Sequence, residues 1–215
     1  MKKEKSMKKP EKAKKKRTWG YKIVRALLVM PIKFLFRIRV KGKENIPEDT
    51  TAYMICANHI CWVDPIIVCS GFRQKIHIMA KKELFKIPVL AQLIRALGAY
   101  PIDRSGGNTG TIKDTIRMLQ DGDSVCMFPQ GTRRRGQSIA DTPLKPGAAM
   151  ISLKAGVPII PVCIKMKDHR FRLFRRNELV IGKPITLEEL AYDPEAPGEY
   201  GRVTALIGQR IAELG

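Results

Sequence analysis

Residues 51–67 read TAYMICANHICWVDPII, and this stretch decides the fold. Its first seven residues are almost all apolar, which is typical of a buried strand. An Asn-His pair follows at once, and we expect a helix around 66–71, with Asp64 suited to the N-cap and Pro65 to the first turn. A buried strand that leads through a short polar loop into a helix is the repeating unit of an α/β fold.

Strand and helix alternate on both sides of this stretch. Strands are expected at 37–40, 75–81, 100–103, 124–129, 157–166 and 178–185, and helices at 88–99, 109–122, 146–156 and 201–214. No internal repeat or interdomain linker is visible. The pattern predicts a single α/β domain with a mixed, largely parallel sheet flanked by helices. In such sheets the functional sites lie at the carboxyl ends of the strands.

The charge is distributed unevenly along the chain. The 215 residues carry a formal net charge of +20, and residues 1–18 alone hold ten Lys or Arg against two Glu. A segment with so little apolar surface does not fold on its own, so we expect a disordered polybasic tail over 1–18. Such a tail attracts anionic lipid head groups or nucleic-acid phosphates, and by itself it does not choose between them.

Residues 19–40, WGYKIVRALLVMPIKFLFRIRV, are strongly apolar but interrupted by charge. The longest uninterrupted apolar run, 26–32, is far shorter than the roughly 20 residues that a membrane-spanning helix needs. Cations recur at helical spacing along one narrow stripe, and Pro31 is expected to bend the helix. The pattern favours an amphipathic helix at the membrane interface; the alternative is a helix packed on the protein's own core. We therefore divide the chain into a tail (1–18), a membrane-associating helical region (19–40) and an α/β domain (41–215).

The five cysteines indicate neither a metal site nor a disulfide framework. No two of them are spaced as C-x-x-C, and most lie within apolar runs, where a free cysteine behaves as a small buried hydrophobic residue. His59 and Cys61 are too few to form a metal site on their own. A reduced protein that faces the cytosol is the simplest interpretation.

His59 follows the predicted strand 51–57 by two residues, which is where a site is expected. On a continuous helix, residues five apart point about 140° away from each other, so His59 and Asp64 meet only if His59 lies in the loop and the helix begins near Asp64. A carboxylate that binds the Nδ1–H of an imidazole leaves Nε2 free as a general base. The alternative is that Asp64 only caps the helix and His59 only bonds to the backbone. No G-x-S-x-G nucleophile is present, so the deprotonated hydroxyl would belong to a substrate.

Basic residues and a glycine follow three other predicted strands. Arg104 ends GAYPIDR, Gly131, Thr132 and Arg133 lie in MFPQGTRRRG, and Lys81 ends a strand. Glycine lets a ligand approach the backbone, and arginine binds phosphate through two hydrogen bonds. If these strand ends converge, a base lies beside a cluster of cations, which suits a substrate that carries a phosphate and a nearby hydroxyl.

With these segments in place, the sequence resembles the glycerophosphate and lysophosphatidic acid acyltransferases. The N-H-x-x-x-x-D motif of that family matches Asn58, His59 and Asp64. The second motif matches 98–104, the third (FPQGTR) matches 128–133, and the fourth (VPIIPV) matches 157–162. Each motif is short, but the ordered set is specific and the resemblance covers roughly residues 20 to 185. Size and the apolar N-terminal region are most similar to the bacterial 1-acylglycerol-3-phosphate acyltransferases.

The resemblance implies that His59, oriented by Asp64, deprotonates the 2-hydroxyl of 1-acylglycerol-3-phosphate, which attacks acyl-CoA or acyl-carrier protein to give phosphatidic acid. It implies that Lys81, Arg104 and Arg133 hold the acceptor's phosphate. Thr132 and Gln130 complete the substrate-binding set, with backbone N–H groups near Gly131 as oxyanion donors. No metal or bound cofactor is implied, and the expected location is the cytoplasmic face of the cell membrane, as a peripheral or monotopic protein.

Two positions depart from the family pattern. Gln130 stands where the family normally has glutamate, which excludes a charged role there but keeps an orienting one. Cys61 stands where a small hydroxyl residue is common, and we interpret it as a packing change.

Two other interpretations remain. One is acylation of glycerol-3-phosphate or another lysophospholipid, because the motifs do not determine the acceptor. The other is a non-catalytic basic protein that binds anionic membranes, which has no need of the ordered motif set. Nucleic acid is not an expected partner, because aromatic residues make up only 7% of the chain and do not interleave with the basic runs.

Overall fold

The computed structural model describes residues 19–47, 51–102, 109–167, 170 and 174–215. Its strands are β1 (Ile38–Lys41), β2 (Met54–Ala57), β3 (Ile76–Lys81), β4 (Ala99–Ile102), β5 (Ser124–Met127), β6 (Ile159–Lys165) and β7 (Asn177–Ile181). Its α-helices are α1 (Trp19–Val24), α2 (Met30–Leu35), α3 (Asp64–Gly71), α4 (Pro88–Ala96), α5 (Thr109–Gln120), α6 (Gly147–Ala155), α7 (Leu187–Leu190) and α8 (Glu199–Glu213). A π-helical turn, η1 (Arg25–Val29), joins α1 to α2, and short 3₁₀ turns are η2 (Lys43–Asn45), η3 (Lys82–Lys86) and η4 (Ile139–Asp141).

The strands form one sheet in the order β1-β7-β6-β2-β5-β3-β4. Every neighbouring pair is parallel except β6 and β7, which are antiparallel. The predicted α/β class with a largely parallel sheet is therefore confirmed. Because β2, β5, β3 and β4 are parallel neighbours, their carboxyl ends lie side by side at one edge of the sheet.

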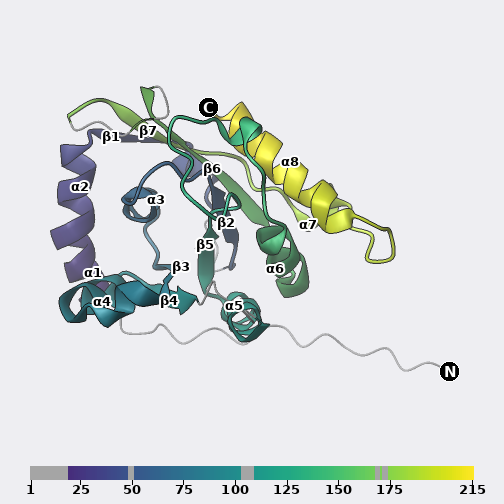
Figure 1. Cartoon of the computed structure of the whole chain (residues 1–215), viewed down its shortest axis with the longest axis horizontal. Coiled ribbons are helices and arrows are strands. Elements are labelled where there is room, and N and C mark those ends of the chain that lie inside the picture. Colours follow the sequence, from purple (N-terminus) through teal and green to yellow (C-terminus); the bar gives the residue numbers. More distant parts are fainter. Residues whose placement is uncertain (1–18, 48–50, 103–108, 168–169, 171–173) are drawn as a thin grey trace.

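The sheet separates two apolar cores, with α3 on one side and α6 and α8 on the other (Figure 1). Successive residues at the start of β2 show how the sequence builds both cores. Tyr53, just before the strand, and Ile55 pack in the core under α3, whereas Met54 and Cys56 pack in the core under α6 and α8. A strand buried on both faces reads as a continuous apolar run, because neither face meets water. This explains the composition of TAYMICA.

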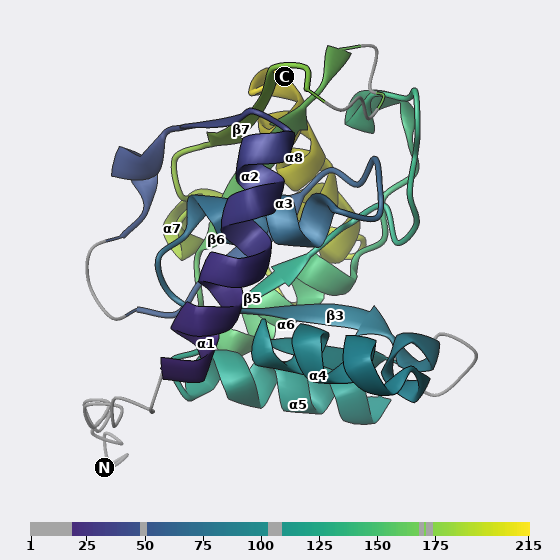
Figure 2. The same cartoon turned by 90° about the vertical axis from the view of Figure 1, so that its left-hand side faces the viewer.

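The N-terminal helices run end to end across one side of the molecule (Figure 2). The π-helical turn η1 ends two residues before Pro31, whose missing N–H interrupts the regular bond pattern. The bend expected at this proline stays a prediction. Tyr21 donates from its hydroxyl to the Gln74 carbonyl over 3.0 Å, and Val29 is fully buried. Within the described ranges, none of the helices combines the length and the apolar character that crossing a bilayer requires.

The structure confirms packing on the core for one face of this helical region, and contact with a membrane stays a prediction for the other. One face packs on the core through Val24, Leu28 and Ile32. The opposite face leaves large apolar side chains in solvent: Ile23 (50% exposed), Leu27 (70%), Met30 (53%) and Phe34 (85%). The expected boundary between residues 40 and 41 falls inside β1, which pairs with β7, so the sheet begins within the segment assigned to the helical region.

Several predicted elements are shorter in the structure, at one end or the other. The helix expected at 88–99 stops at Ala96, because Gly98 has a φ of 99° and turns the chain so that Ala99 can begin β4. The strand expected at 178–185 stops at Ile181, and Ile185 forms only an isolated bridge with Ile159. The strand expected at 51–57 starts at Met54, where pairing with β6 and β5 begins. The polybasic tail lies outside the described residues.

Candidate active site

The loop after β2 brings His59 and Asp64 together. Nδ1 of His59 lies 2.8 Å from Oδ2 of Asp64, with the imidazole 14% exposed and the carboxylate fully buried. Helix α3 begins at Asp64, and residues 58–63 bend back over its first turn. The expectation that the pair meets only across a loop and a helix start is therefore met.

Asp64 does not take the N-cap position predicted for it. The residue before it, Val63, occupies the cap position, and no side-chain cap hydrogen bond forms. The carboxylate instead accepts hydrogen bonds from the loop: Oδ2 accepts from the N–H of Ile60 (2.5 Å) and of Cys61 (2.7 Å), in addition to the imidazole. A buried carboxylate with this many donors is held in one orientation.

Cys61 supplies a further donor, to the other carboxylate oxygen. Its Sγ lies 2.8 Å from Oδ1 of Asp64, so the interpretation of Cys61 as a packing change is wrong. Burial, together with the negative charge of Asp64, raises the pKa of the thiol well above its usual range, which keeps it protonated as a donor. The family prefers a small hydroxyl residue at this position, and a hydroxyl, like a thiol, can donate a hydrogen bond. The interpretation from size alone missed this signal.

Asn58 attaches the loop to the neighbouring strand. Its side-chain nitrogen donates to the Ile164 carbonyl (3.0 Å) and its oxygen accepts from the Ile164 N–H (2.7 Å). The amide thus imitates a peptide group and continues the β2–β6 pairing one position past Ala57. This contact explains why the motif has an amide immediately before the histidine.

The third motif and Arg134, the residue directly after it, hold the backbone of His59 from both sides. Oε1 of Gln130 accepts from the His59 N–H (2.7 Å), and the N–H of Arg134 donates to the His59 carbonyl (2.7 Å). The Phe128 ring stacks on the imidazole, with centroids 4.2 Å apart and an interplanar angle of 23°. These contacts join the carboxyl ends of β2 and β5 around one histidine.

Gln130 is buried, and both ends of its amide bond to the protein. Nε2 donates to Oγ1 of Thr142 (2.8 Å), whose hydroxyl donates to the Ile139 carbonyl (3.0 Å). Gln130 was predicted as a substrate contact, and the structure places its side chain between the His59 backbone and Thr142. No local pattern in the sequence pointed to Thr142, because the pairing joins two loops.

The other predicted site residues are placed less completely. Gly131 has a φ of 67°, a left-handed backbone conformation that favours glycine, and the nearest atoms to a Cβ there would belong to the flexible Lys145 side chain, at 2.9 Å. Its N–H donates to the Phe128 carbonyl (2.9 Å), which makes this particular N–H a turn donor.

Thr132 and Arg133 are exposed on the same loop. Lys81 is exposed at the carboxyl end of β3 and lies 3.6 Å from Glu83. Arg104 lies outside the described residues.

Neither a metal cluster nor a disulfide appears in the part of the chain that the structure describes. No group of three or more His, Cys, Asp and Glu side chains is placed to hold a metal ion there. The cysteines Cys56, Cys61, Cys69, Cys126 and Cys163 are free thiols and all are buried.

Comparison with known proteins agrees with this geometry. The family model for acyltransferases matches residues 37–165. The 1-acyl-sn-glycerol-3-phosphate acyltransferase of Bacillus subtilis is 33% identical over 82% of this chain and 87% of its own, and that of Escherichia coli is 32% identical over 84% and 76%. The crystal structure of the 1-acyl-sn-glycerophosphate acyltransferase PlsC from Thermotoga maritima superposes with a TM-score of 0.63 at 26% identity, covering 88% of this chain and 80% of that one.

Proposed function

The chain belongs to the acyltransferase family, and from this premise we propose that it acylates the 2-hydroxyl of 1-acylglycerol-3-phosphate to give phosphatidic acid for phospholipid synthesis. The observation that carries the proposal is the His59–Asp64 pair, whose 2.8 Å contact leaves the imidazole partly accessible and the carboxylate buried. The named relatives support the acceptor. The acyl donor is a thioester of coenzyme A or of acyl-carrier protein.

His59 is the general base of the proposed reaction. With Nδ1–H donated to Asp64, Nε2 takes the proton of the acceptor's 2-hydroxyl as its oxygen attacks the thioester carbonyl carbon. The tetrahedral intermediate collapses by breaking the carbon–sulfur bond, and the proton on Nε2 passes to the departing thiolate. The products are phosphatidic acid and a free thiol, and the histidine returns to its neutral state.

Lys81, Arg104 and Arg133 are the proposed ligands of the acceptor's phosphate, with Thr132 beside them. Lys81 and Arg133 support this role because both are exposed cations that follow adjacent strands at the edge where His59 lies. Gln130 acts as a positioning residue, since its amide bonds to the His59 backbone and to Thr142. Backbone donors for the oxyanion must come from residues next to Gly131, because the N–H of Gly131 closes a turn.

The proposed location is the cytoplasmic face of the cell membrane, with the protein bound peripherally. The apolar face of α1, η1 and α2, formed by Ile23, Leu27, Met30 and Phe34, would enter the head-group region. The polybasic tail supplies a second, electrostatic attraction to anionic lipids. A substrate and a product that both reside in the bilayer make such contact useful.

A detergent-micelle assay tests the function directly. The full chain is given 1-oleoylglycerol-3-phosphate with palmitoyl-CoA or palmitoyl-acyl-carrier protein, and both thiol release and phosphatidic acid are followed. His59→Ala should abolish turnover. His77→Gln is the matched control, because His77 lies in β3 and pairs with Asp123 at 3.6 Å, away from the His59 loop. Turnover of glycerol-3-phosphate but not of the lysophospholipid would refute the proposed acceptor. Inactivity with every acceptor and donor would favour the membrane-binding alternative.

A further inference from the structure

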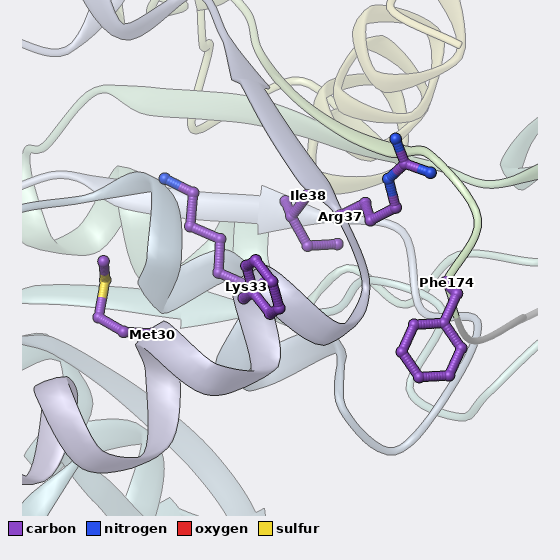
Figure 3. A pocket seen from close by; sticks show the side chains of 6 residues that line it. Met30, Lys33, Arg37, Ile38 and Phe174 are labelled. Atoms are coloured by element: carbon purple, nitrogen blue, oxygen red, sulfur yellow. The ribbon is translucent and has the colours of Figure 1, made fainter.

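A groove lies beside the end of α2. It measures about 520 Å³ and is lined by Met30, Lys33, Phe34, Arg37, Ile38 and Phe174 (Figure 3). None of these residues belongs to the candidate active site. We propose that the groove binds one anionic glycerophospholipid of the membrane, with its phosphate at Lys33 and Arg37 and the start of an acyl chain along Phe34 and Phe174.

The lining combines the two chemistries that such a lipid presents. Figure 3 shows the amine of Lys33 and the guanidinium of Arg37 at opposite ends of the groove, with Met30 on the Lys33 side and the Phe174 ring on the Arg37 side. Phe34 and Phe174 are 85% and 66% exposed, which is unusual for phenylalanine on a protein that meets only water. An amphiphile covers the rings with its chain and reaches the cations with its head group.

Cations outnumber acidic side chains around the groove, although Lys41 is paired with Glu178. Residues 33–43 contain five Lys or Arg and no Asp or Glu, and no acidic residue lines the groove. Burial and the nearby charges of Lys43 and Arg25 lower the pKa of Lys33. A lysine crowded by other cations gains from a bound anion, and a phosphate offers it one.

The backbone at the groove is strained at two points. Among the described residues, only Arg37 (φ 45°), Phe174 (φ 58°) and Ala191 (φ 43°) are non-glycine residues with a positive φ, and two of these three line the groove. Bulky side chains rarely adopt this conformation, and such strain gathers at ligand sites. The Phe174 N–H donates to the Leu35 carbonyl (3.2 Å), which holds the ring beside α2.

A lipid fits better than an acidic protein. The groove lies at the end of α2 and continues the exposed apolar face that Ile23, Leu27 and Met30 form along α1, η1 and α2. A partner that covers this face therefore also reaches the groove. A bilayer presents chains and phosphates together over such an area, whereas a carrier-protein helix would have to cover a long apolar strip as well. The inference rests on the proposed function only in requiring that the enzyme works at a membrane.

Binding can be measured with short-chain lipids that stay monomeric, without a bilayer. In full-length His59→Ala protein, the ¹³C-methyl resonance of Met30, assigned through Met30→Leu, is followed during titration with dihexanoylphosphatidic acid. We expect a saturable shift. The double variant Lys33→Gln with Arg37→Gln should raise the dissociation constant about tenfold or more, since it removes both phosphate ligands. Phe174→Ala should also weaken binding, because it removes part of the chain contact while keeping the charges.

The control removes two exposed cations elsewhere, Lys154→Gln with Lys183→Gln, and should leave the titration unchanged. Dihexanoylphosphatidylcholine should bind at least about tenfold more weakly, because its head group carries no net charge. Equal binding of the two lipids, equal binding of inorganic phosphate, or a groove double variant that behaves like the control would each overturn the proposal. So would a Met30 shift caused by acyl-carrier protein and not by lipid. The Met30 methyl shift needs no turnover, so the lipid titration can be interpreted even if the acyltransferase assay fails.

Discussion

The thiol of Cys61 donates a hydrogen bond to Oδ1 of Asp64 over 2.8 Å, and both oxygens of this buried carboxylate are therefore bound. Oδ2 holds the imidazole and two loop N–H groups, so the thiol supplies the remaining contact on the other side. The orientation of the proposed base thus depends on a buried residue outside the proposed substrate-binding set.

Replacing this thiol tests its positioning role. Cys61→Ala should lower kcat about tenfold with little change in KM, because a hydrogen bond to a charged group contributes roughly 1.5–3 kcal/mol and its loss lets the carboxylate rotate. Cys61→Ser restores a donor and should recover most of the activity. The measurement is steady-state kinetics on the three proteins. A fully active Cys61→Ala, or a Cys61→Ser as poor as Cys61→Ala, would contradict the role.

Asp64→Asn should reduce kcat/KM by roughly 10²–10⁴, the usual contribution of an oriented base. The amide oxygen would take the place of Oδ2 and accept from the loop N–H groups and the imidazole without a negative charge, while the amide nitrogen would face the Cys61 thiol, which loses its acceptor. Single-turnover rates with saturating thioester provide the measurement, and Asp121→Asn, at an exposed position after α5, serves as the control. Retention of near-normal chemistry in Asp64→Asn would rule out the proposed dyad.

Gln130→Glu should keep activity within about threefold, because the new carboxylate still accepts from the His59 N–H and the Thr142 hydroxyl can rotate to donate to it. The same change combined with Thr142→Val should lose most activity and melt earlier, since a buried carboxylate then faces a methyl group. Activity and thermal unfolding of the single and double variants provide the test. Additive, small effects would show that Thr142 does not support position 130.

Asn58→Ala should lower the free energy of unfolding by about 2–3 kcal/mol, because it leaves the N–H and C=O of Ile164 buried without their partners. Urea denaturation measures the change. Asn58→Asp keeps the acceptor and loses the donor, so its free energy of unfolding should lie between those of the wild type and Asn58→Ala. An alanine variant as stable as the wild type would mean that this contact does not hold the loop.

The buried thiols predict a loss of stability at alkaline pH. Burial raises the pKa of Cys56 to about 12, while the same thiol in the unfolded chain titrates near its ordinary value of 9.0. Below pH 9 the thiol is protonated in both states and contributes no pH dependence. Above it the unfolded state releases a proton that the folded state keeps, so stability falls as pH rises, by about 1.4 kcal/mol per pH unit for this group.

The variant Cys56→Ala isolates this contribution. Between pH 8.5 and 10.5 its free energy of unfolding should fall less steeply than that of the wild type, by about 2 kcal/mol in total. Urea titrations at several pH values give both slopes, and any constant loss from the smaller side chain cancels in the comparison. Parallel slopes would contradict a raised thiol pKa.

Local patterns predicted most of the fold. Apolar runs such as 124–129 and helical repeats such as 109–122 lie within two residues of β5 and α5, because burial on both strand faces and on one helix face selects these patterns directly. The spacing of His59 and Asp64 also predicted the loop and the helix start. Element ends were less predictable, because the end of β2 or β7 depends on where its neighbour stops pairing.

The sequence by itself thus determined the α/β class, the position of the histidine after a strand and the basic residues at neighbouring strand ends, since each follows from short-range periodicity and residue chemistry. Only the tertiary structure decided that β7 runs antiparallel to β6, that Asn58 binds Ile164 and that Gln130 joins His59 to Thr142. It also divided the N-terminal helices into a face on the core and a face in solvent. These features depend on which segments become neighbours in space. Hydrogen-bond partners such as Asn58 and Ile164, or His59 and Gln130, lie more than 70 residues apart and leave no periodic trace in the chain.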